Sequence, residues 1–426
     1  MQTKLAPQYQ GTPEGEVAER VLRACVHCGF CLATCPTYQV LGNELDSPRG
    51  RIYLMKQVFE GAVPTAKTQL HLDRCLTCRN CETTCPSGVQ YGRLLDAGRA
   101  VVEAAVGRGA AATLARGALK RGLSRPALFG AGLKLGRAAR GLLPGSLKSK
   151  LPAAAPAGAW PAPRHARRML VLEGCVQPGL RPVINAAAAR VLDRLGISLV
   201  AEPQAGCCGA LAHHLNDHRD GLDAMRRNVD AWLPHLERGV EAIVMTASGC
   251  GVMVKDYGWQ LRHDPLYAEK AARISAATRD ISEILLAERE ALSRLVPPAS
   301  TAPGTASPGD TAPRAPLVHK VAYHPPCTLQ HGQQLGGGVE SLLAACGFEL
   351  TPVADKHLCC GSAGTYSILQ PEIAGELKTR KLASLHAGRP DVIATANIGC
   401  LAHLQSGSAL PVKHWVELLD AKLASS

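Results

Sequence analysis

Two stretches of the chain carry four cysteines each at the same spacing. Residues 25–36 read CVHCGFCLATCP and residues 75–86 read CLTCRNCETTCP, so both follow C-x2-C-x2-C-x3-C-P. Thiolates are metal ligands, and thiolates this close in sequence can converge on one metal centre. The chain has 17 cysteines in all. Because that number is odd, metal or redox chemistry is expected rather than a fully paired disulfide framework.

This spacing is typical of bacterial ferredoxin motifs. Three close thiolates hold three corners of a [4Fe–4S] cluster, and the fourth cysteine, before the proline, holds the other cluster. The ligand sets are therefore expected to cross between the two motifs. One cluster is predicted on Cys25, Cys28, Cys31 and Cys85, and the second on Cys35, Cys75, Cys78 and Cys81.

The alternative is a pair of zinc sites in a basic binding module, since the net charge is +12. Zinc leaves the third close cysteine and the proline of each motif without a role. The excess of Lys and Arg lies outside the cysteine motifs, and neither motif has the pattern of a base-reading helix. The sequence therefore favours iron–sulfur clusters and no nucleic-acid partner.

The second half of the chain is a repeat with further cysteines. The β-prone runs MLVLEGC and HKVAYHPPC end at Cys175 and Cys327, and in each half 31 residues separate that cysteine from a vicinal pair, in AGCCGA or HLCCGS. The runs AIVMTASGC and DVIATANIGC then end at Cys250 and Cys400. This alternation predicts two α/β domains with parallel sheets, whose cysteines gather at the carboxyl ends of the strands.

The elements around the motifs can also be predicted. Between the two cysteine motifs, Asp46 or Ser47 is expected to cap a helix that begins near Pro48. Residues 101–150 contain ten Lys or Arg and one acid. They are expected to form solvated linker helices or, alternatively, a surface for anionic lipid or an acidic partner. Residues 151–164 and 297–316 have linker composition.

With these motifs, the chain resembles the iron–sulfur subunits of flavin-dependent 2-hydroxy-acid and glycerol-3-phosphate dehydrogenases, in particular that of bacterial glycolate oxidase. Stretches such as EGCVQP, AGCCGA, CTLQH and LCCGSAGTY carry the resemblance. It implies an α+β multidomain fold, with a helical two-[4Fe–4S] ferredoxin-like module followed by two α/β cysteine-rich (CCG) domains. The expected parts are 1–100 (ferredoxin-type), 101–167 (basic linker helices), 168–296 (first CCG domain), 297–316 (disordered linker) and 317–426 (second CCG domain).

The resemblance also implies a function. Glycolate would be oxidised to glyoxylate on a partner subunit that binds FAD, because this chain has no G-x-G-x-x-G after a strand and no identifiable catalytic residue. The chain would carry electrons toward a membrane quinone. No apolar run is long enough to span a bilayer, so a cytoplasmic, peripheral location at the inner face of the membrane is expected. Lactate and glycerol-3-phosphate dehydrogenase subunits share the architecture and remain alternatives.

The CCG pattern of the family ends in C-x-x-C, but this chain has Met253 and His403 at the last positions. A third metal site is therefore uncertain and, if present, is expected in the second domain, where His403 offers an imidazole. His324 and His357 are near this site in sequence, and each is interpreted as a satisfied surface histidine, with a role as a further ligand as the alternative. The residues with a possible redox or metal role are Cys175, Cys207, Cys208, Cys250, Cys327, Cys359, Cys360, Cys400 and His403.

Overall fold

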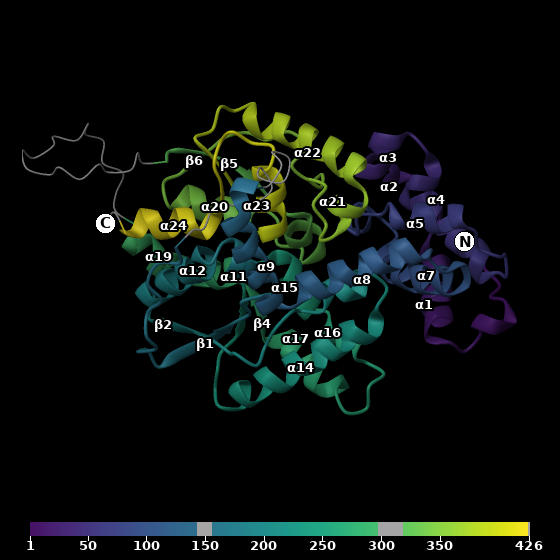
Figure 1. Ribbon diagram of the computed structural model, residues 1–426, viewed down its shortest axis with the longest axis horizontal. Helices are drawn as coiled ribbons and strands as arrows, with labels where there is room; N and C mark the ends of the chain where they lie inside the picture. Colours follow the sequence, from purple (N-terminus) through teal and green to yellow (C-terminus); the bar gives the residue numbers. More distant parts are fainter. Residues whose placement is uncertain (143–155, 297–317, 425–426) are drawn as a thin grey trace, which may run out of the picture.

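The computed structural model describes residues 1–142, 156–296 and 318–424. The linker expected at 297–316, and part of the one expected at 151–164, lie outside these residues. Figure 1 shows a helical N-terminal module at one end of the molecule and two α/β domains packed beside each other against it. The predicted fold class, α+β and multidomain, is confirmed.

The N-terminal module is a bundle of short and medium helices. Its buried core is built from apolar side chains of α1, α4 and α7. The helix predicted near Pro48 is α4, and its cap is Ser47, whose side chain accepts a hydrogen bond from the Gly50 amide. The elements are η1 (Pro7–Tyr9), α1 (Pro13–Ala24), α2 (Phe30–Ala33), α3 (Pro36–Leu41), η2 (Glu44–Asp46), α4 (Pro48–Phe59), α5 (Ala66–Asp73), α6 (Asn80–Thr83) and α7 (Tyr91–Val106).

The first α/β domain contains one parallel sheet with the strand order β2-β1-β3-β4. Helices lie on both faces, so the central strands are buried and carry continuous apolar runs. Its elements are β1 (Arg167–Val171), α11 (Gln177–Leu180), α12 (Val183–Arg194), β2 (Ile197–Ala201), α13 (Ala210–His214), α14 (His218–Glu237), β3 (Ile243–Met245), α15 (Ser248–Val254), α16 (Tyr257–Gln260), α17 (Ala268–Ala277), β4 (Thr278–Asp280), α18 (Ile281–Ala287) and α19 (Arg289–Leu295).

The second α/β domain repeats this sheet with the order β6-β5-β7-β8, again parallel throughout. The prediction of two parallel sheets from the repeated strand–helix pattern is therefore confirmed. Its elements are β5 (Lys320–His324), η4 (Thr328–Gly332), α20 (Gly338–Ala345), β6 (Glu349–Leu350), α21 (Tyr366–Leu369), α22 (Pro371–His386), β7 (Val392–Thr395), α23 (Ile398–Gln405), β8 (Val412–His414) and α24 (Trp415–Ala424).

The two α/β domains pack reciprocally. In each domain, a helix that follows the first strand contacts a helix that follows the last strand of the other domain, α12 against α24 and α20 against α18. Arg190 on α12 reaches Asp420 on α24 at 2.6 Å, and one buried apolar cluster runs through both domains. Reciprocal contacts of this kind are what an approximate two-fold axis produces.

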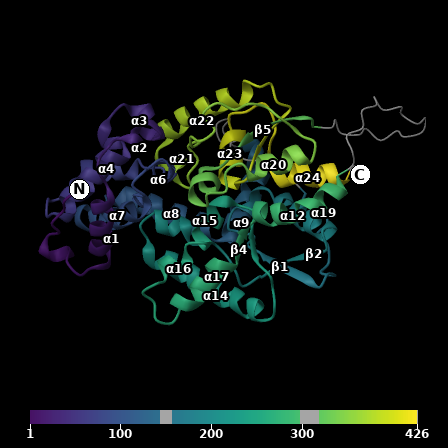
Figure 2. The ribbon, with the colours of Figure 1, turned by 180° about the vertical axis from the view of Figure 1, so that it is seen from behind.

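The basic stretch forms the helices α8 (Ala110–Ser124) and α9 (Pro126–Ala138), followed by η3 (Ala139–Leu142). In both views they run along the seam where the two α/β domains meet (Figures 1 and 2). Phe129 and Leu133 of α9 pack on Gly179, where a Cβ atom would lie only 3.1 Å from the Phe129 ring. Most other side chains of α8 and α9 are exposed or half-buried.

The N-terminal module is fixed to both α/β domains by polar contacts. Toward the first domain, Arg93 forms a bidentate ion pair with Asp256, and its guanidinium lies over the Trp259 ring, 4.4 Å from the centroid. Toward the second domain, Thr83 Oγ1 lies 2.9 Å from His331 Nδ1, and the Asn80 amide donates to the His357 carbonyl at 3.2 Å. The cysteine motifs are therefore held against the sheets.

Candidate metal centres

The two cysteine motifs share an unusual backbone conformation. His27 and Gly29 in the first motif, and Thr77 and Arg79 at the equivalent positions in the second, all have positive φ angles of 53–90°. Residues other than glycine rarely adopt this region, and they do so mostly where function requires it. Each loop therefore curls tightly enough for three closely spaced cysteines to face one centre.

The eight cysteines line two adjacent cavities. The first is lined by Cys25, Cys28, Cys31 and Cys85. The second is lined by Cys35, Cys75, Cys78 and Cys81. The structure thus brings three cysteines of one motif to the last cysteine of the other, in both directions. Cys81, Pro48 and Tyr91 line both cavities, so the two sites share a wall.

Four of these thiols, Cys25, Cys31, Cys78 and Cys81, lie in buried surroundings that raise their pKa values. Burial raises the pKa of Cys31 to about 11 and raises the pKa values of Cys78 and Cys81 well above the usual value. Thiols lose their protons when a metal binds, so the positive charge of the metal replaces that of the released protons. Sets of four convergent thiols fit [4Fe–4S] clusters. Which thiol binds which cluster stays a prediction.

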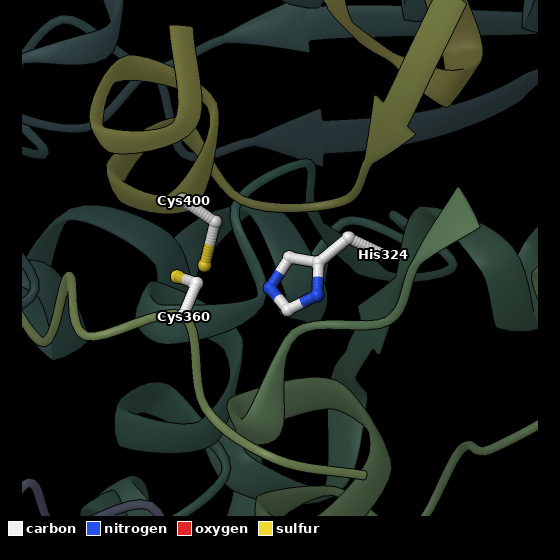
Figure 3. Close-up of side chains that lie close together, drawn as sticks. All are labelled: His324, Cys360 and Cys400. Carbon is white, nitrogen blue, oxygen red and sulfur yellow. The ribbon is translucent and has the colours of Figure 1, made fainter. Parts of the chain in front are cut away.

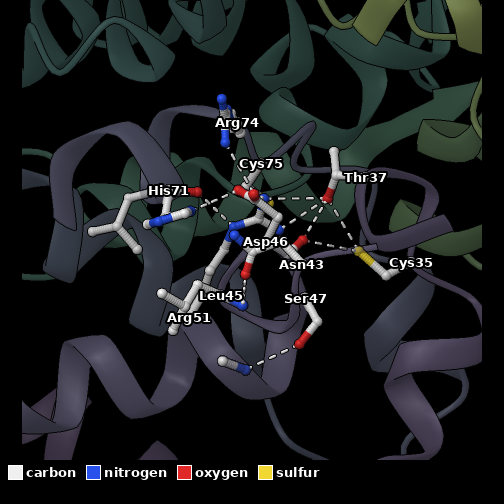
Figure 4. Close-up of polar contacts among 12 residues, drawn as sticks. Cys35, Thr37, Asn43, Leu45, Asp46, Ser47, Arg51, His71, Arg74 and Cys75 are labelled. Carbon is white, nitrogen blue, oxygen red and sulfur yellow. Dashed lines mark hydrogen bonds and ion pairs between the residues drawn. The ribbon is translucent and has the colours of Figure 1, made fainter. Parts of the chain in front are cut away.

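A buried carboxylate organises the wall of the second cavity (Figure 4). Asp46 is fully buried, and its carboxylate lies 3.0 Å from both Arg74 Nη1 and His71 Nδ1 and 3.5 Å from Arg51 Nη2. The close approach of η2 to α4 requires Gly50, because a Cβ atom there would lie 2.1 Å from the Glu44 carbonyl oxygen. The segment between the motifs is therefore tied to the second motif.

This network continues to a cysteine of the second cavity. Arg51 is 1% exposed and donates to the His71 carbonyl at 2.6 Å and to Thr37 Oγ1 at 3.1 Å. Thr37 Oγ1 lies 3.2 Å from Cys35 Sγ (Figure 4). The sequence analysis missed these roles, having considered Asp46 only as a helix cap. In the sequence, Arg51 stands among the apolar positions of α4 that face the core. A buried charge needs a partner, so this arginine could have indicated the network.

The carboxyl ends of the strands carry the cysteines of the CCG domains. In the first domain, Cys175 and Cys250 follow the adjacent strands β1 and β3, and the pair Cys207 and Cys208 follows β2. The four thiols interact as a group, and hydrogen bonds from Cys175 and Cys208 lower the pKa of Cys207. Met253 is buried beside them and has no thiolate to offer.

The second domain brings together the equivalent set. Cys327 Sγ lies 3.8 Å from Cys359 Sγ, Cys359 is hydrogen-bonded to Cys360, and Cys360 interacts with Cys400. The expected ligand His403 instead has Nε2 3.2 Å from the Ala374 carbonyl oxygen.

Two histidines near this set differ in burial. His324 lies beside Cys360 and Cys400, in the interior of the protein (Figure 3). The interpretation of His324 as a surface histidine is wrong, because it is the last residue of a central strand and is covered by the following loops. His357 is half-buried, and its carbonyl accepts the hydrogen bond from Asn80.

The second CCG set adjoins the second cavity of the N-terminal module. Leu76, Cys327, Cys359 and Tyr366 belong to one buried cluster, and Cys78 packs against it. The Tyr366 hydroxyl donates to the Arg74 carbonyl across this boundary at 2.9 Å. The cysteines therefore form a continuous path from the first cavity, through the second, to the second CCG domain.

Comparison with known proteins agrees with this architecture. The model of the 4Fe–4S dicluster domain family matches residues 21–89, and that of the cysteine-rich (CCG) domain family matches residues 169–255 and 321–405. The two cofactors of the N-terminal module are thus [4Fe–4S] clusters, and the zinc alternative for these eight cysteines is not supported.

Three relatives are informative. The chain is 51% identical to the glycolate oxidase iron-sulfur subunit of Escherichia coli, over 99% of both chains. It is 30% identical to the probable glycolate oxidase iron-sulfur subunit of Bacillus subtilis, over 94% of this chain and 92% of the relative. Its identity to lactate utilization protein A of Bacillus licheniformis is 25%, over 58% of this chain and 97% of the relative.

The Asp46 network yields a stability prediction. Asp46→Asn removes the charge that compensates the buried Arg51, and breaking a buried ion pair from one side costs about 3–5 kcal/mol. We expect the variant to lose its visible iron–sulfur absorbance at distinctly lower denaturant or temperature than the unaltered protein. Glu44→Gln, which removes a more exposed ion pair with Arg49, should cost below about 1 kcal/mol. Equal losses in the two variants would contradict the organising role of Asp46.

Proposed function

The chain belongs to the family of glycolate oxidase iron–sulfur subunits, and we propose that it carries electrons from an FAD-bearing partner subunit, where glycolate becomes glyoxylate, toward a quinone in the membrane. Bound [4Fe–4S] clusters accept and release single electrons. The observation that carries the proposal is the continuous path of cysteines from the first cavity to the second CCG domain.

The ligand sets we propose are those that the two cavities bring together. Cys25, Cys28, Cys31 and Cys85 hold one cluster, and Cys35, Cys75, Cys78 and Cys81 hold the other. The role of the protein is to bury these sulfurs, to neutralise their charge with groups such as Arg51, and to fix the two sites against each other through the shared wall at Cys81 and Tyr91. Substrate chemistry belongs to the partner.

The rim of the first cavity is the surface that we assign to the FAD-bearing partner. Cys28 is exposed there, and its neighbours Val26 and Phe30 are 66% and 64% exposed. Exposed apolar side chains that gather around a site are typical of interaction surfaces. The second cavity is covered on one side by the second CCG domain, so it suits the outgoing step.

The related alternatives differ mainly in the substrate. A subunit of a lactate or glycerol-3-phosphate dehydrogenase would use the same clusters, because the flavin partner selects the substrate. The match to lactate utilization protein A covers 58% of this chain, whereas the match to the E. coli glycolate oxidase subunit covers 99%. This difference favours glycolate.

We further propose that α8 and α9 rest on the anionic surface of the inner membrane. Leu114 and Leu135 are 74% and 73% exposed, and Arg121, Arg125 and Lys134 are exposed as well. No Asp or Glu occurs between residues 104 and 142. Exposed apolar and basic side chains on one helical element suit binding in the interface of a bilayer. None of the helices in the described ranges has the length and apolar run needed to cross a membrane.

The electron-transfer role predicts that cluster ligands are needed for quinone reduction but not for flavin reduction. In the assembled complex, Cys25→Ala should lower the iron content from about eight to about four per chain and reduce glycolate-dependent quinone reduction about tenfold or more. Reduction of a dye that accepts electrons directly from the flavin should persist. Cys346→Ala, which removes a buried cysteine outside both cavities, is the matched control. Undiminished quinone reduction by the Cys25 variant would refute the role.

The docking surface predicts a selective effect of one added charge. Phe30→Glu should weaken binding of the FAD-bearing subunits about tenfold or more, because the carboxylate would have to be desolvated in the contact. Binding can be titrated with purified subunits, with the iron–sulfur spectrum recorded to check that the clusters remain. Val63→Glu changes a residue that is 86% exposed on the same module but does not line the cavity, and it should have no effect. If both variants bind normally, the partner docks elsewhere.

The membrane contact predicts a charge-dependent loss of vesicle binding. Each basic residue near an anionic surface contributes about 1 kcal/mol, so R121E/R125E/K134E should weaken binding to phosphatidylglycerol-containing vesicles about a hundredfold or more. Salt should reduce the difference, because it screens the attraction. The control K67E/R219E/R289E carries the same charge change at exposed positions on other elements. Equal binding by the two variants would exclude α8 and α9 as the contact.

A further inference from the structure

The burial of the second cavity poses an electrostatic problem for a cluster bound there. Reduction adds one negative charge to a cluster that its four thiolates already make anionic. Cys28 is exposed at the rim of the first cavity, whereas the second cavity is covered at Cys78 by the second CCG domain. Moving a charge away from water is costly unless nearby groups compensate it. A buried cluster therefore accepts an electron readily only where the protein supplies hydrogen bonds or positive charge.

One buried hydroxyl supplies such a hydrogen bond. Tyr91 is 4% exposed, and its hydroxyl donates to Cys75 Sγ at 3.7 Å. A thiolate that binds a cluster carries no hydrogen, so the hydroxyl remains the donor when the site is occupied. Tyr91 lines both cavities and stands in the wall between them. The bond is thus made where an electron would pass from one site to the other.

The second motif fixes the position of this tyrosine. Tyr91 is the first residue of α7, and the amide of the next residue, Gly92, donates to the Glu82 carboxylate at 2.6 Å. Glu82 lies on α6 inside the second motif and is also paired with Arg79 at 2.8 Å. The start of α7 is therefore tied to the same motif whose sulfur the hydroxyl reaches.

A buried cation supplies positive charge at the same cavity (Figure 4). Arg51 lines the second cavity, and its partner Asp46 is shared with Arg74, so the two arginines and the one carboxylate carry one positive charge in excess. Burial lowers the pKa of the Arg51 guanidinium, but negative charge on groups that include Cys75 and Cys35 raises this pKa by more. Because the attraction is mutual, the guanidinium also favours negative charge on the sulfurs.

The hydroxyl comes in addition to donors that both motifs share. Backbone amides of His27 and Arg49 donate to sulfurs of the first cavity. In the second cavity, the Thr77 amide donates to Cys75 Sγ at 3.5 Å in the same way. The hydrogen bond from Tyr91 therefore distinguishes the second site from the common pattern.

We propose that Tyr91 and the buried Arg51 raise the reduction potential of the [4Fe–4S] cluster in the second cavity and so draw electrons inward from the first. Hydrogen bonds to the sulfurs and the charge around them are among the factors that set cluster potentials. Tyr91 is a positioning residue that acts through Cys75. It keeps its proton, because reduction adds one electron to the cluster and breaks no bond. The inference rests on the proposed electron-transfer role.

The test is a redox titration of the full chain, purified without oxygen, reduced stepwise with dithionite and followed by low-temperature EPR. Two one-electron waves are expected, and the Cys25→Ala protein, which keeps all four cysteines of the second cavity, identifies the wave of the second cluster. Tyr91→Phe keeps the ring and removes the hydroxyl. It should make reduction of the second cluster about tenfold less favourable, which is a shift of about 59 mV to lower potential. The other wave should move far less.

Tyr366→Phe is the matched control. Tyr366 is also buried, in the cluster that adjoins the second cavity, but its hydroxyl donates to the Arg74 carbonyl at 2.9 Å and not to sulfur. This variant should leave both waves in place. Three results would each overturn the proposal: an unmoved second wave in Tyr91→Phe, a larger shift of the first cluster than of the second, or an equal shift in Tyr366→Phe.

A second variant keeps the proposal testable if Tyr91→Phe does not retain its clusters. Tyr91→3-fluorotyrosine keeps the hydroxyl, and its fluorine withdraws electrons from the ring and makes the hydroxyl a stronger donor. The potential of the second cluster should then rise, and a lowered or unchanged potential would contradict the proposal. Because the titration uses no partner subunit, glycolate or quinone, its outcome is separate from that of the quinone-reduction test of the proposed function.

Discussion

The crossing of the two cysteine motifs is the constraint on which the rest of the molecule depends. Each cavity takes three thiols from one motif and the fourth from a motif fifty residues away, so neither site can form unless both motifs are folded together. The chain between them, η2 and α4, must therefore be positioned as accurately as the cysteines themselves. The buried Asp46 positions this segment through its ion pairs with Arg51, His71 and Arg74. Charged hydrogen bonds fix the direction of approach more strictly than apolar packing does.

The sheets impose a second, independent geometry. In the order β2-β1-β3-β4, the chain reverses direction across the sheet between β1 and β3, and that switch point is where open parallel sheets bind ligands. Cys175 and Cys250 follow those two strands, and Cys327 and Cys400 follow β5 and β7 in the other domain. The cysteines at the ends of two strands thus come together because the topology places those strand ends side by side. Since the α/β domain occurs twice in the chain, two such cysteine groups form.

The sequence was sufficient for the features that depend on spacing. It predicted the helix at Pro48, the two parallel sheets and the helices of the basic stretch, because each follows from local pattern. The crossed cysteine ligand sets stay a prediction. It did not reveal the Asp46 network or the burial of His324. Both depend on which segments pack over a side chain, and a single His or Asp carries no periodicity that reports its neighbours. His403, placed by the family spacing, lies against a carbonyl because α22 packs over it.

The two CCG domains began from one pattern and now differ in what their cysteine edges contact. The first domain meets the N-terminal module through charge: Arg93 pairs with Asp256, and His213 lies 3.3 Å from Asp96. The second meets it through neutral hydrogen bonds, such as that from Asn80 to the His357 carbonyl, and through sulfur and apolar side chains at Cys78, Cys327 and Leu76. The contact of the second domain brings its cysteines directly against Cys78 of the second cavity. The first domain is therefore suited to hold the module in place, and the second to exchange electrons with it.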